Sequence, residues 1–270
     1  MPRSADKFTL YMAGAGRNPH QYDLVLKDWD YERSPMSLLF SFAYHDDITK
    51  LFKDGHHKKA TRLILDSGAY TAFSTGSEID LDAYMEFIHS KHGQRFDEVV
   101  GLDVIDDPDR GRLTFRNCME MKRNGIECIP VFHYGDDEKW LVKYSKNFEK
   151  VGLSITSSMR VSDRYNFLRW AFQQVYPHKF HMFGWASKTL LSQFPFHSAD
   201  TTSYMATGFR YGSWSAFHNM KGVCKVRKQD AFRMSIHEIL RGLKVEREIQ
   251  AQWSMEIDRQ QTAWRLKNAK

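Results

Sequence analysis

The feature that most constrains this chain is a repeated alternation of short apolar runs with longer amphipathic segments. Most of the runs are continuously apolar, which is typical of parallel strands that are covered on both faces. Eight runs of five to eight residues predict strands at Phe8–Met12, Ser37–Tyr44, Arg62–Asp66, Glu98–Ile105, Glu127–Tyr134, Lys150–Ile155, Lys179–Trp185 and Phe196–Thr202.

The intervening segments carry helical signals. After the third run, apolar residues repeat at i, i+3, i+4 and i+7, at Leu81, Tyr84, Met85 and Ile88. Asp80 is placed to cap that helix, and Asp163 to cap the helix after the sixth run. Gly125 stands where a helix C-terminus favours glycine, and residues 187–194 predict a short helix. The first two connections show no clear pattern.

Eight strands alternating with helices predict an α/β fold, a (β/α)8 TIM-type barrel. A doubly wound open sheet is the alternative, because strand count alone does not close a barrel. We expect residues 1–204 to form the barrel and residues 205–270 to form a basic loop and helical extension packed on it. Within that extension, 205–227 predicts a loop or hairpin and 228–267 one or two helices.

The composition excludes several protein classes. Of 270 residues, 42% are hydrophobic and 14% aromatic, which supports a sizeable core and argues against disorder. No stretch approaches the roughly 20 apolar residues of a membrane span, and the start MPRSADKF lacks a signal core. We therefore expect a cytoplasmic protein without membrane contact. Cys118, Cys128 and Cys224 are too widely spaced for a zinc motif, so we expect buried free thiols and no metal.

The positive charge is concentrated at one end of the chain. The net charge is +6, and residues 221–270 hold 12 Lys or Arg against 6 Asp or Glu. A neutral body with a basic tail indicates a polyanionic partner, although a basic solvated helix surface would look the same.

Polar residues stand at the ends of the predicted strands. Asp66 ends the third run, Asp103 lies in the fourth, His133 in the fifth and Asp200 in the eighth. Catalytic groups of such barrels lie at the C-terminal strand ends, so these four side chains should converge on one mouth. Each also has an ordinary explanation: Asp66 as a turn cap, Asp103 as the partner of a nearby Lys or Arg, and Asp200 as a helix N-cap.

Three stretches resemble the tRNA-guanine transglycosylases. They are "LILDSGAYTAF", "GLDVIDDP" and "HMFGWASKTLLSQFPFHSADTTS", and the resemblance spans about residues 8–204. Within that family the chain looks most like the phage-type members, which place 7-deazaguanine bases in DNA. The resemblance implies Asp200 as nucleophile, Asp66 as general acid/base, Asp103 as the base-binding aspartate and His133 at the place of a base-contacting glutamine. It also implies substrate contacts from Ser67, Gly68, Tyr70 and Gly184.

The function implied by the resemblance is exchange of guanine in DNA for a 7-deazaguanine base, through a covalent aspartyl-glycosyl intermediate and without a cofactor. The chain departs from the family by lacking its zinc cysteines and the glycine pair after the sixth strand. A phage-encoded protein would act in the host cytoplasm, as a homodimer or with an accessory protein. The basic residues expected to contact phosphates are Lys221, Lys225, Arg227 and Lys228.

Alternatives stay open on the sequence. A transglycosylase acting on tRNA, or a glycosidase that only removes a base, would use the same carboxylates. A non-catalytic nucleic-acid-binding barrel would use the basic tail alone.

Overall fold

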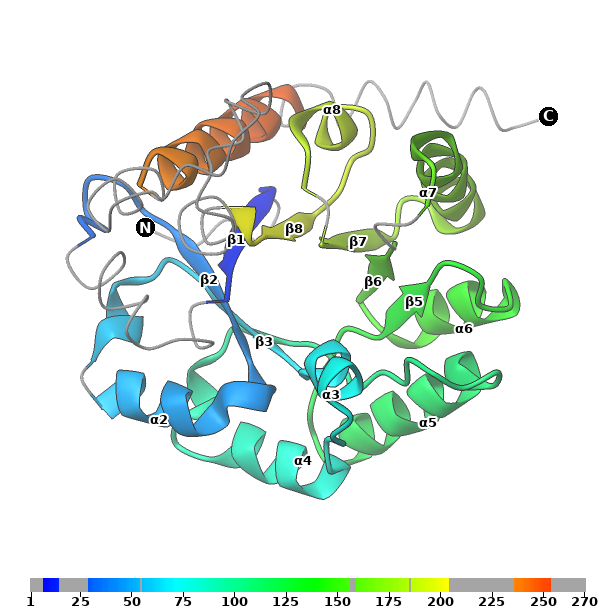
Figure 1. The fold of residues 1–270 in the computed structure, drawn as a ribbon. Helices are drawn as coiled ribbons and strands as arrows, with labels where there is room; N and C mark the ends of the chain where they lie inside the picture. The colour runs from blue at the N-terminus through cyan, green and yellow to red at the C-terminus, as the bar shows by residue number, and fades with distance from the viewer. Residues whose placement is uncertain are drawn as a thin grey trace, which may run out of the picture.

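The computed structural model describes residues 7–14, 29–53, 55–155, 159–184, 186–203 and 236–253. Their strands form one parallel sheet in the order β4-β3-β2-β1-β8-β7-β6-β5, seen end-on as a ring in Figure 1. The strands are β1 Thr9–Ala13, β2 Ser37–Ser41, β3 Leu63–Asp66, β4 Glu98–Val99, β5 Val131–His133, β6 Lys150–Ser154, β7 Lys179–Phe183 and β8 Ser198–Thr201.

The ring closes between β4 and β5. Val100 and Ile129 form a parallel bridge there, and the Ile129 amide donates to the Val99 carbonyl at 2.8 Å. The predicted (β/α)8 barrel is therefore confirmed, and the open sheet is excluded.

Helices follow the strands and line the outside of the ring, except α3, which lies nearer its centre (Figure 1). They are α2 His45–Lys53, α3 Ala69–Thr75, α4 Leu81–His89, α5 Arg110–Arg123, α6 Lys139–Asn147, α7 Val161–Val175 and α8 Lys188–Leu191, with short 3-10 turns at Phe42–Tyr44, His56–Lys59 and Gly93–Arg95. As predicted, Asp80 caps α4 by accepting the Ala83 amide at 2.8 Å. Asp163 is not the cap of α7, because the helix begins at Val161 and Asp163 lies in its first turn, paired with Arg160.

Several predicted strands are longer than the observed ones. The run 37–44 leaves the sheet after Ser41 and turns into the 3-10 helix Phe42–Tyr44. The run 98–105 keeps only Glu98–Val99 and the bridge at Val100 as sheet. The Gly101 amide still donates to the Ile129 carbonyl, and the chain then leaves the sheet and carries Asp103 to Ser67 and His133.

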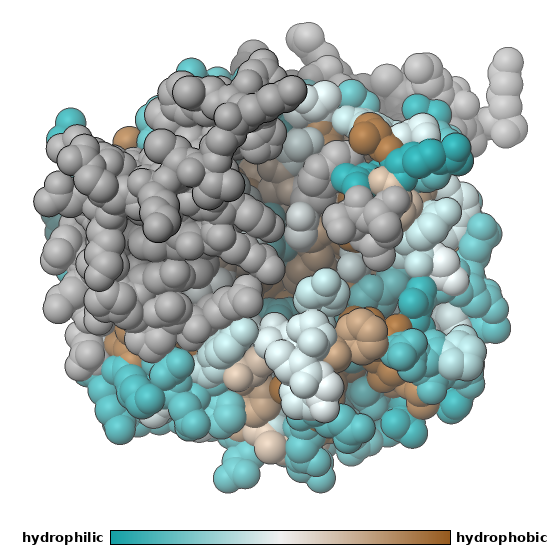
Figure 2. All heavy atoms as spheres, in the orientation of Figure 1, coloured by the Kyte–Doolittle hydropathy of each residue, from teal (hydrophilic) through white to brown (hydrophobic). Residues whose placement is uncertain are grey.

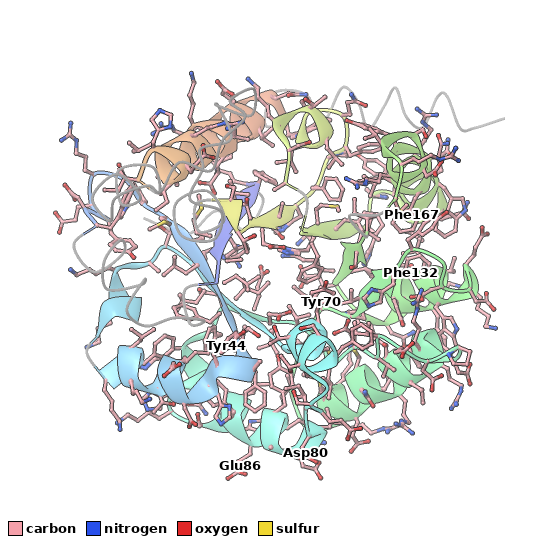
Figure 3. The ribbon with its side chains drawn as sticks, in the orientation of Figure 1. Tyr44, Tyr70, Asp80, Glu86, Phe132 and Phe167 are labelled. Atoms are coloured by element: carbon pink, nitrogen blue, oxygen red, sulfur yellow. The ribbon has the colours of Figure 1, made fainter. Side chains whose placement is uncertain are left out.

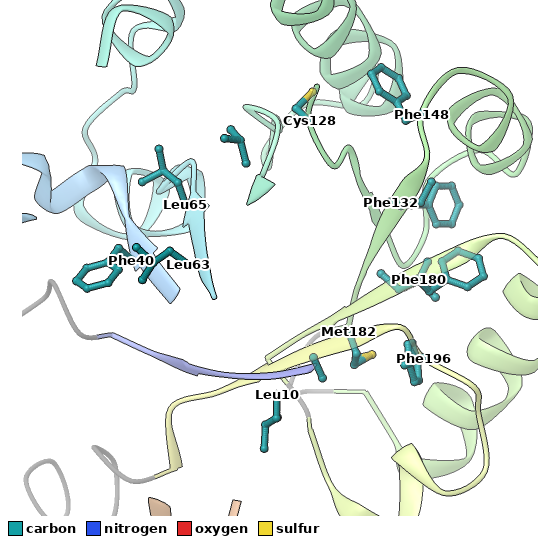
Figure 4. Packing of buried hydrophobic residues seen from close by; sticks show 14 of the residues in the cluster. Leu10, Phe40, Leu63, Leu65, Cys128, Phe132, Phe148, Phe180, Met182 and Phe196 are labelled. Atoms are coloured by element: carbon teal, nitrogen blue, oxygen red, sulfur yellow. The ribbon is translucent and has the colours of Figure 1, made fainter. Parts of the chain in front are cut away.

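The apolar residues fill two layers. The larger core lies between the sheet and the helices, where outward-facing strand residues such as Phe40, Leu65, Phe132 and Phe180 pack (Figure 4). A smaller cluster fills the inside of the barrel, with Tyr11, Ala13, Leu39, Ile64, Val100, Ile129 and Val131. Strand residues alternate between these layers because successive side chains point to opposite faces.

One end of the barrel interior is closed by an ionic cluster, which we call the floor and define as Arg62, Glu98 and Lys150. Lys150 Nζ lies 2.8 Å from both Glu98 oxygens, and Arg62 Nη2 lies 2.8 Å from Glu98 Oε1. These residues stand at the N-terminal ends of β3, β4 and β6, so the floor lies opposite the strand ends that carry Asp66 and Asp200.

The helix at residues 236–253 follows β8 and lies beside β1, drawn in orange in Figure 1. Its Glu246 accepts the Leu10 amide at 2.9 Å, and its Gln250 donates to the Phe8 carbonyl at 2.7 Å. A Cβ on Gly242 would lie 2.7 Å from Met12 Cε, so the glycine allows this close approach. The predicted helical extension is confirmed for this segment, whereas the domain boundary at residue 204 stays a prediction.

None of the helices in the described ranges combines the length and apolar character that crossing a bilayer requires. Lys221, Lys225, Arg227 and Lys228 lie outside the described residues, as do Cys224 and the loop or hairpin expected at 205–227.

Candidate active site

The barrel brings the predicted polar residues together at its C-terminal mouth. Asp66 ends β3, His133 ends β5, Asp200 lies in β8, and Asp103 lies in the connection from β4 to α5. The space-filling view along the barrel axis shows the centre of the molecule hollowed (Figure 2). We call these four side chains the mouth cluster.

Asp66 is held by the sharp turn that follows β3. Gly68 has φ +83°, and its amide donates to Asp66 Oδ2 at 3.0 Å. A Cβ on Gly68 would lie 2.7 Å from the Ala43 amide nitrogen, so no larger residue fits between β3 and β2. The turn-cap explanation of Asp66 is thus correct as far as it goes, and it also fixes the direction of the carboxylate.

The environment of Asp66 disfavours its negative charge. Burial, which is the largest cause, and the charges of Asp103 and Asp200 together raise the pKa of Asp66 to about 7, although the Gly68 hydrogen bond lowers it. Among the described residues, no lysine or arginine forms a salt bridge with this carboxylate. At neutral pH a carboxyl group with that pKa is protonated in about half of the molecules and ionised in the others.

Asp103 is fully engaged with other side chains. Ser67 Oγ donates to Asp103 Oδ1 at 3.2 Å, and His133 Nε2 lies 2.8 Å from Oδ2. The aspartate is therefore held by a serine and a histidine rather than by the Lys or Arg that the ordinary explanation required. Because a carboxylate only accepts, the His133 proton facing it sits on Nε2.

Neighbouring helices hold the loop that carries Asp103. Asn117 on α5 donates to the Leu102 carbonyl at 3.1 Å, and Thr114 accepts the Val104 amide at 2.9 Å. The buried Tyr84 hydroxyl on α4 donates to the Val100 carbonyl at 2.8 Å. These contacts fix the loop from outside the barrel.

His133 is supported by a pair that the sequence analysis missed. Asp136 accepts the His133 amide at 2.9 Å and forms a salt bridge with Arg110. The only sequence signal was the acidic pair in "HYGDD", which does not identify its partner on α5.

Asp200 lies within β8 and points into the barrel, so it is not a helix N-cap. The amide of Gly184, which has φ +74°, donates to Asp200 Oδ1 at 3.1 Å. His181 Nε2 lies 3.5 Å from the same oxygen. His181 and Ser198 were missed as site residues, although the alternation of Lys179, His181 and Phe183 with Phe180 and Met182 indicates an inward histidine.

The remaining predicted substrate contacts differ in placement. Tyr70 is 73% exposed on α3, which lies at the inner edge of the ring (Figure 3). Ser67 is buried and Gly68 uses its amide on Asp66. A pocket of about 480 Å³ lies beside the mouth cluster, lined by residues of α3, the 76–79 turn and the loop 102–106 that includes Asp103. Contact of any of these residues with a substrate stays a prediction.

No group of three His, Cys, Asp or Glu side chains that could hold a metal ion occurs in the described part of the chain.

Comparisons with known proteins support the fold and correct the family. No protein-family model matches the chain, and no curated protein does. Among solved structures, the chain is similar to a mutant tryptophan synthase alpha-subunit from Pyrococcus furiosus, with 10% identity, 87% of this chain and 98% of that chain covered, and a TM-score of 0.50. A chain from Aquifex aeolicus VF5 shares 11% identity over 91% of this chain and 93% of that one, with a TM-score of 0.47. A 2,3-dimethylmalate lyase, a PEP mutase/isocitrate lyase superfamily member, shares 11% over 90% and 94%, with a TM-score of 0.39.

The resemblance to tRNA-guanine transglycosylases is therefore wrong as a family assignment. No family model or curated protein supports it, and the similar structure with a TM-score of 0.50 is a tryptophan synthase alpha-subunit. The predicted exchange of guanine in DNA for a 7-deazaguanine base is corrected with it. The physical reason lies in the motif itself: an Asp-Ser-Gly stretch is what this strand end needs for a left-handed turn against Ala43.

Proposed function

We propose that the chain is an enzyme that carries out general acid–base chemistry on a small polar molecule bound at the C-terminal mouth. Asp66 is the proton donor and acceptor, and the Asp200 carboxylate is its counterpart on the other side of the mouth. Catalytic groups of TIM-type barrels come from the ends of several strands, and the mouth cluster has that distribution.

The single observation that carries the proposal is the state of Asp66. Its pKa of about 7 lets one carboxyl group deliver or take a proton at neutral pH with little free-energy cost. A fold that only needed a turn cap would gain nothing from burying that carboxyl beside two others. Strongly perturbed groups in a hollow are typical of functional sites.

In the proposed reaction one proton is removed from the substrate and another is delivered. The Asp200 carboxylate accepts a proton from a substrate O–H, N–H or C–H bond, whose electron pair shifts to form the new bond. Protonated Asp66 gives its proton to the atom whose bond breaks and becomes a carboxylate. Transfer between the two groups through the product or water restores the starting state.

The charges of the mouth limit the substrate class. Asp66, Asp103 and Asp200 place three carboxyl groups around one hollow, which repels phosphates and carboxylates. Oxygen acceptors at the strand ends favour a neutral or positively charged molecule with N–H or O–H groups.

The test compares four purified proteins incubated with a small-molecule cell extract and followed by mass spectrometry. They are the wild type, Asp66→Asn, Asp200→Asn and a control, Asp82→Asn, whose exposed carboxylate lies in the first turn of α4. We expect a compound that the wild type and Asp82→Asn consume and the two mouth variants do not. Equal profiles for all four proteins, or unchanged conversion by Asp66→Asn, would overturn the proposal.

A further inference from the structure

A buried histidine lies directly beneath the mouth cluster. His181 stands on the inner face of β7 with no exposed surface. Its Nδ1 lies 2.8 Å from Ser198 Oγ on β8, while its Nε2 makes no hydrogen bond within the described residues. That unpaired nitrogen is aimed at Asp200 Oδ1, 3.5 Å away. A buried polar atom without a partner is costly, so its direction needs an explanation.

The rest of the histidine's surroundings holds the ring in place. The Phe183 ring lies 4.3 Å from it between centroids and the Tyr11 ring 6.1 Å. The Glu98 carboxylate of the floor lies below, paired with Lys150 and Arg62. Asp200 is therefore the polar group toward which the free nitrogen points.

Geometry decides which nitrogen of His181 carries the proton. The Ser198 hydroxyl can donate or accept, so it is compatible with either tautomer. A carboxylate can only accept, so a lone pair on Nε2 would face the negative oxygens of Asp200. The Nε2–H tautomer, with Ser198 donating to Nδ1, satisfies both neighbours.

We propose that His181 is a positioning residue for Asp200. The Nε2–H of His181 and the amide of Gly184 both face Asp200 Oδ1 and together hold that oxygen in place. This inference rests on the proposed function in assigning Asp200 a chemical role. The 3.5 Å separation is longer than a hydrogen bond, so the Nε2–H dipole attracts Asp200 Oδ1 as a polar contact, beside the hydrogen bond that the Gly184 amide donates to the same oxygen.

Two substitutions separate the donor that faces Asp200 from the rest of the imidazole. The amide nitrogen of His181→Gln reaches the place of Nε2, whereas that of His181→Asn reaches only the place of Nδ1, beside Ser198. Both remove the aromatic ring and supply an amide, and they differ from each other by one methylene group. A difference between them reports the donor to Asp200.

The Gly184 amide provides a readout that needs no substrate, because its hydrogen bond goes to Asp200 Oδ1. Its resonance and its hydrogen exchange are followed by NMR in the wild type, both histidine variants and Asp200→Ala. We expect Asp200→Ala to shift the resonance and speed exchange, His181→Asn to follow it, and His181→Gln to stay near the wild type. Nitrogen-15 shifts of the wild-type imidazole should show the proton on Nε2.

Several outcomes overturn the inference. One is a proton on Nδ1 of His181. Another is a Gly184 amide whose resonance and exchange do not change in His181→Asn, and the third is an equal effect of the Gln and Asn variants on that amide. Once a substrate is known, His181→Asn should lower kcat about 10- to 100-fold with KM little changed, and His181→Gln should restore most of it. If Gly184 responds as expected but no compound is converted, the proposed function fails while the positioning of Asp200 stands.

Discussion

The two ends of the barrel interior treat buried carboxylates in opposite ways. At the floor, burial alone would raise the pKa of Glu98, but the charge and hydrogen bonds of Lys150 and the charge of Arg62 outweigh it and lower the pKa. At the mouth, burial and two neighbouring carboxylates raise the pKa of Asp66 to about 7. The same barrel thus holds one carboxylate, Glu98, that is paired with cations and one, Asp66, that faces other carboxylates.

The difference separates a carboxylate whose charge stabilises the fold from one whose charge opposes it. Two cations surround Glu98, so removing its charge would leave them buried without a partner. Asp66 faces like charges, so its ionisation works against folding. Sites where local energetics conflict with stability are where function is expected, which is why the proposal rests on the mouth and not on the floor.

The largest expected effect is on catalysis at the mouth. Asp66→Asn keeps the size of the side chain and an acceptor for the Gly68 amide, but it can neither deliver nor take a proton. We expect turnover of the compound found in the extract comparison to fall about 10²- to 10⁴-fold. Steady-state kinetics against the wild type checks this, and Asp82→Asn should behave as wild type. Full activity of Asp66→Asn would remove the contrast between the two ends.

The next largest effect is on stability at the floor. Glu98→Gln leaves Lys150 and Arg62 without a counter-charge and should lower the free energy of unfolding at pH 7 by about 3–5 kcal/mol. Because the folded pKa is lowered, the contribution of Glu98 is present above its unfolded pKa and is lost as pH falls through the folded value. Denaturant unfolding measures it, with Glu149→Gln in the exposed Glu149–Lys179 pair as control. A change no larger than the control's would contradict the stabilising role of the floor.

The stability contributed by Asp66 at the mouth should depend on pH with the opposite sign. Ionisation of Asp66 opposes folding because the folded pKa is raised, so the stability it contributes is complete below about pH 4 and lost as pH rises through 7. The free energy of unfolding of Asp66→Asn should therefore exceed that of the wild type by about 2–4 kcal/mol at pH 8 and should be almost equal to it at pH 4. Unfolding curves at both pH values decide the matter, and a variant less stable than wild type at pH 8 would show that Asp66 is a structural carboxylate.

The smallest expected effect concerns Glu246, on the helix at residues 236–253. Burial raises the pKa of Glu246 to about 7, although the Leu10 amide hydrogen bond lowers it. Glu246→Gln keeps an acceptor for the Leu10 amide. Its free energy of unfolding should exceed that of the wild type by about 1–2 kcal/mol at pH 8 and by less at pH 5. Activity should not change, because Glu246 lies outside the barrel interior. Its carboxylate accepts a hydrogen bond from the Leu10 amide of β1 there. Thermal unfolding and turnover together show whether a raised pKa away from the mouth affects stability alone.

Local patterns predicted most of the fold. Continuous apolar runs placed all eight strands, and the Asp80 cap and the glycine after α5 mark helix ends correctly. Strand lengths were overestimated most at β2, β4 and β5, because residues beside a strand, such as Phe42, Leu102 and Cys128, can be buried without joining the sheet. Asp163 lies in the first turn of α7 rather than at its cap, because local capping signals place a helix start only to within one or two residues.

The sequence by itself determined the barrel class and the presence of carboxylates at strand ends, because both depend on the periodicity and identity of neighbouring residues. Only the tertiary structure decided that His133 meets Asp103, that His181 faces Asp200, and that Lys150 and Arg62 meet at Glu98, 52 and 36 residues away. The pKa of Asp66 belongs to the same class, since burial and the charges of residues from other strands set it. Such contacts join distant segments through space, and a strand's own residues carry no record of which side chains will stand across the barrel.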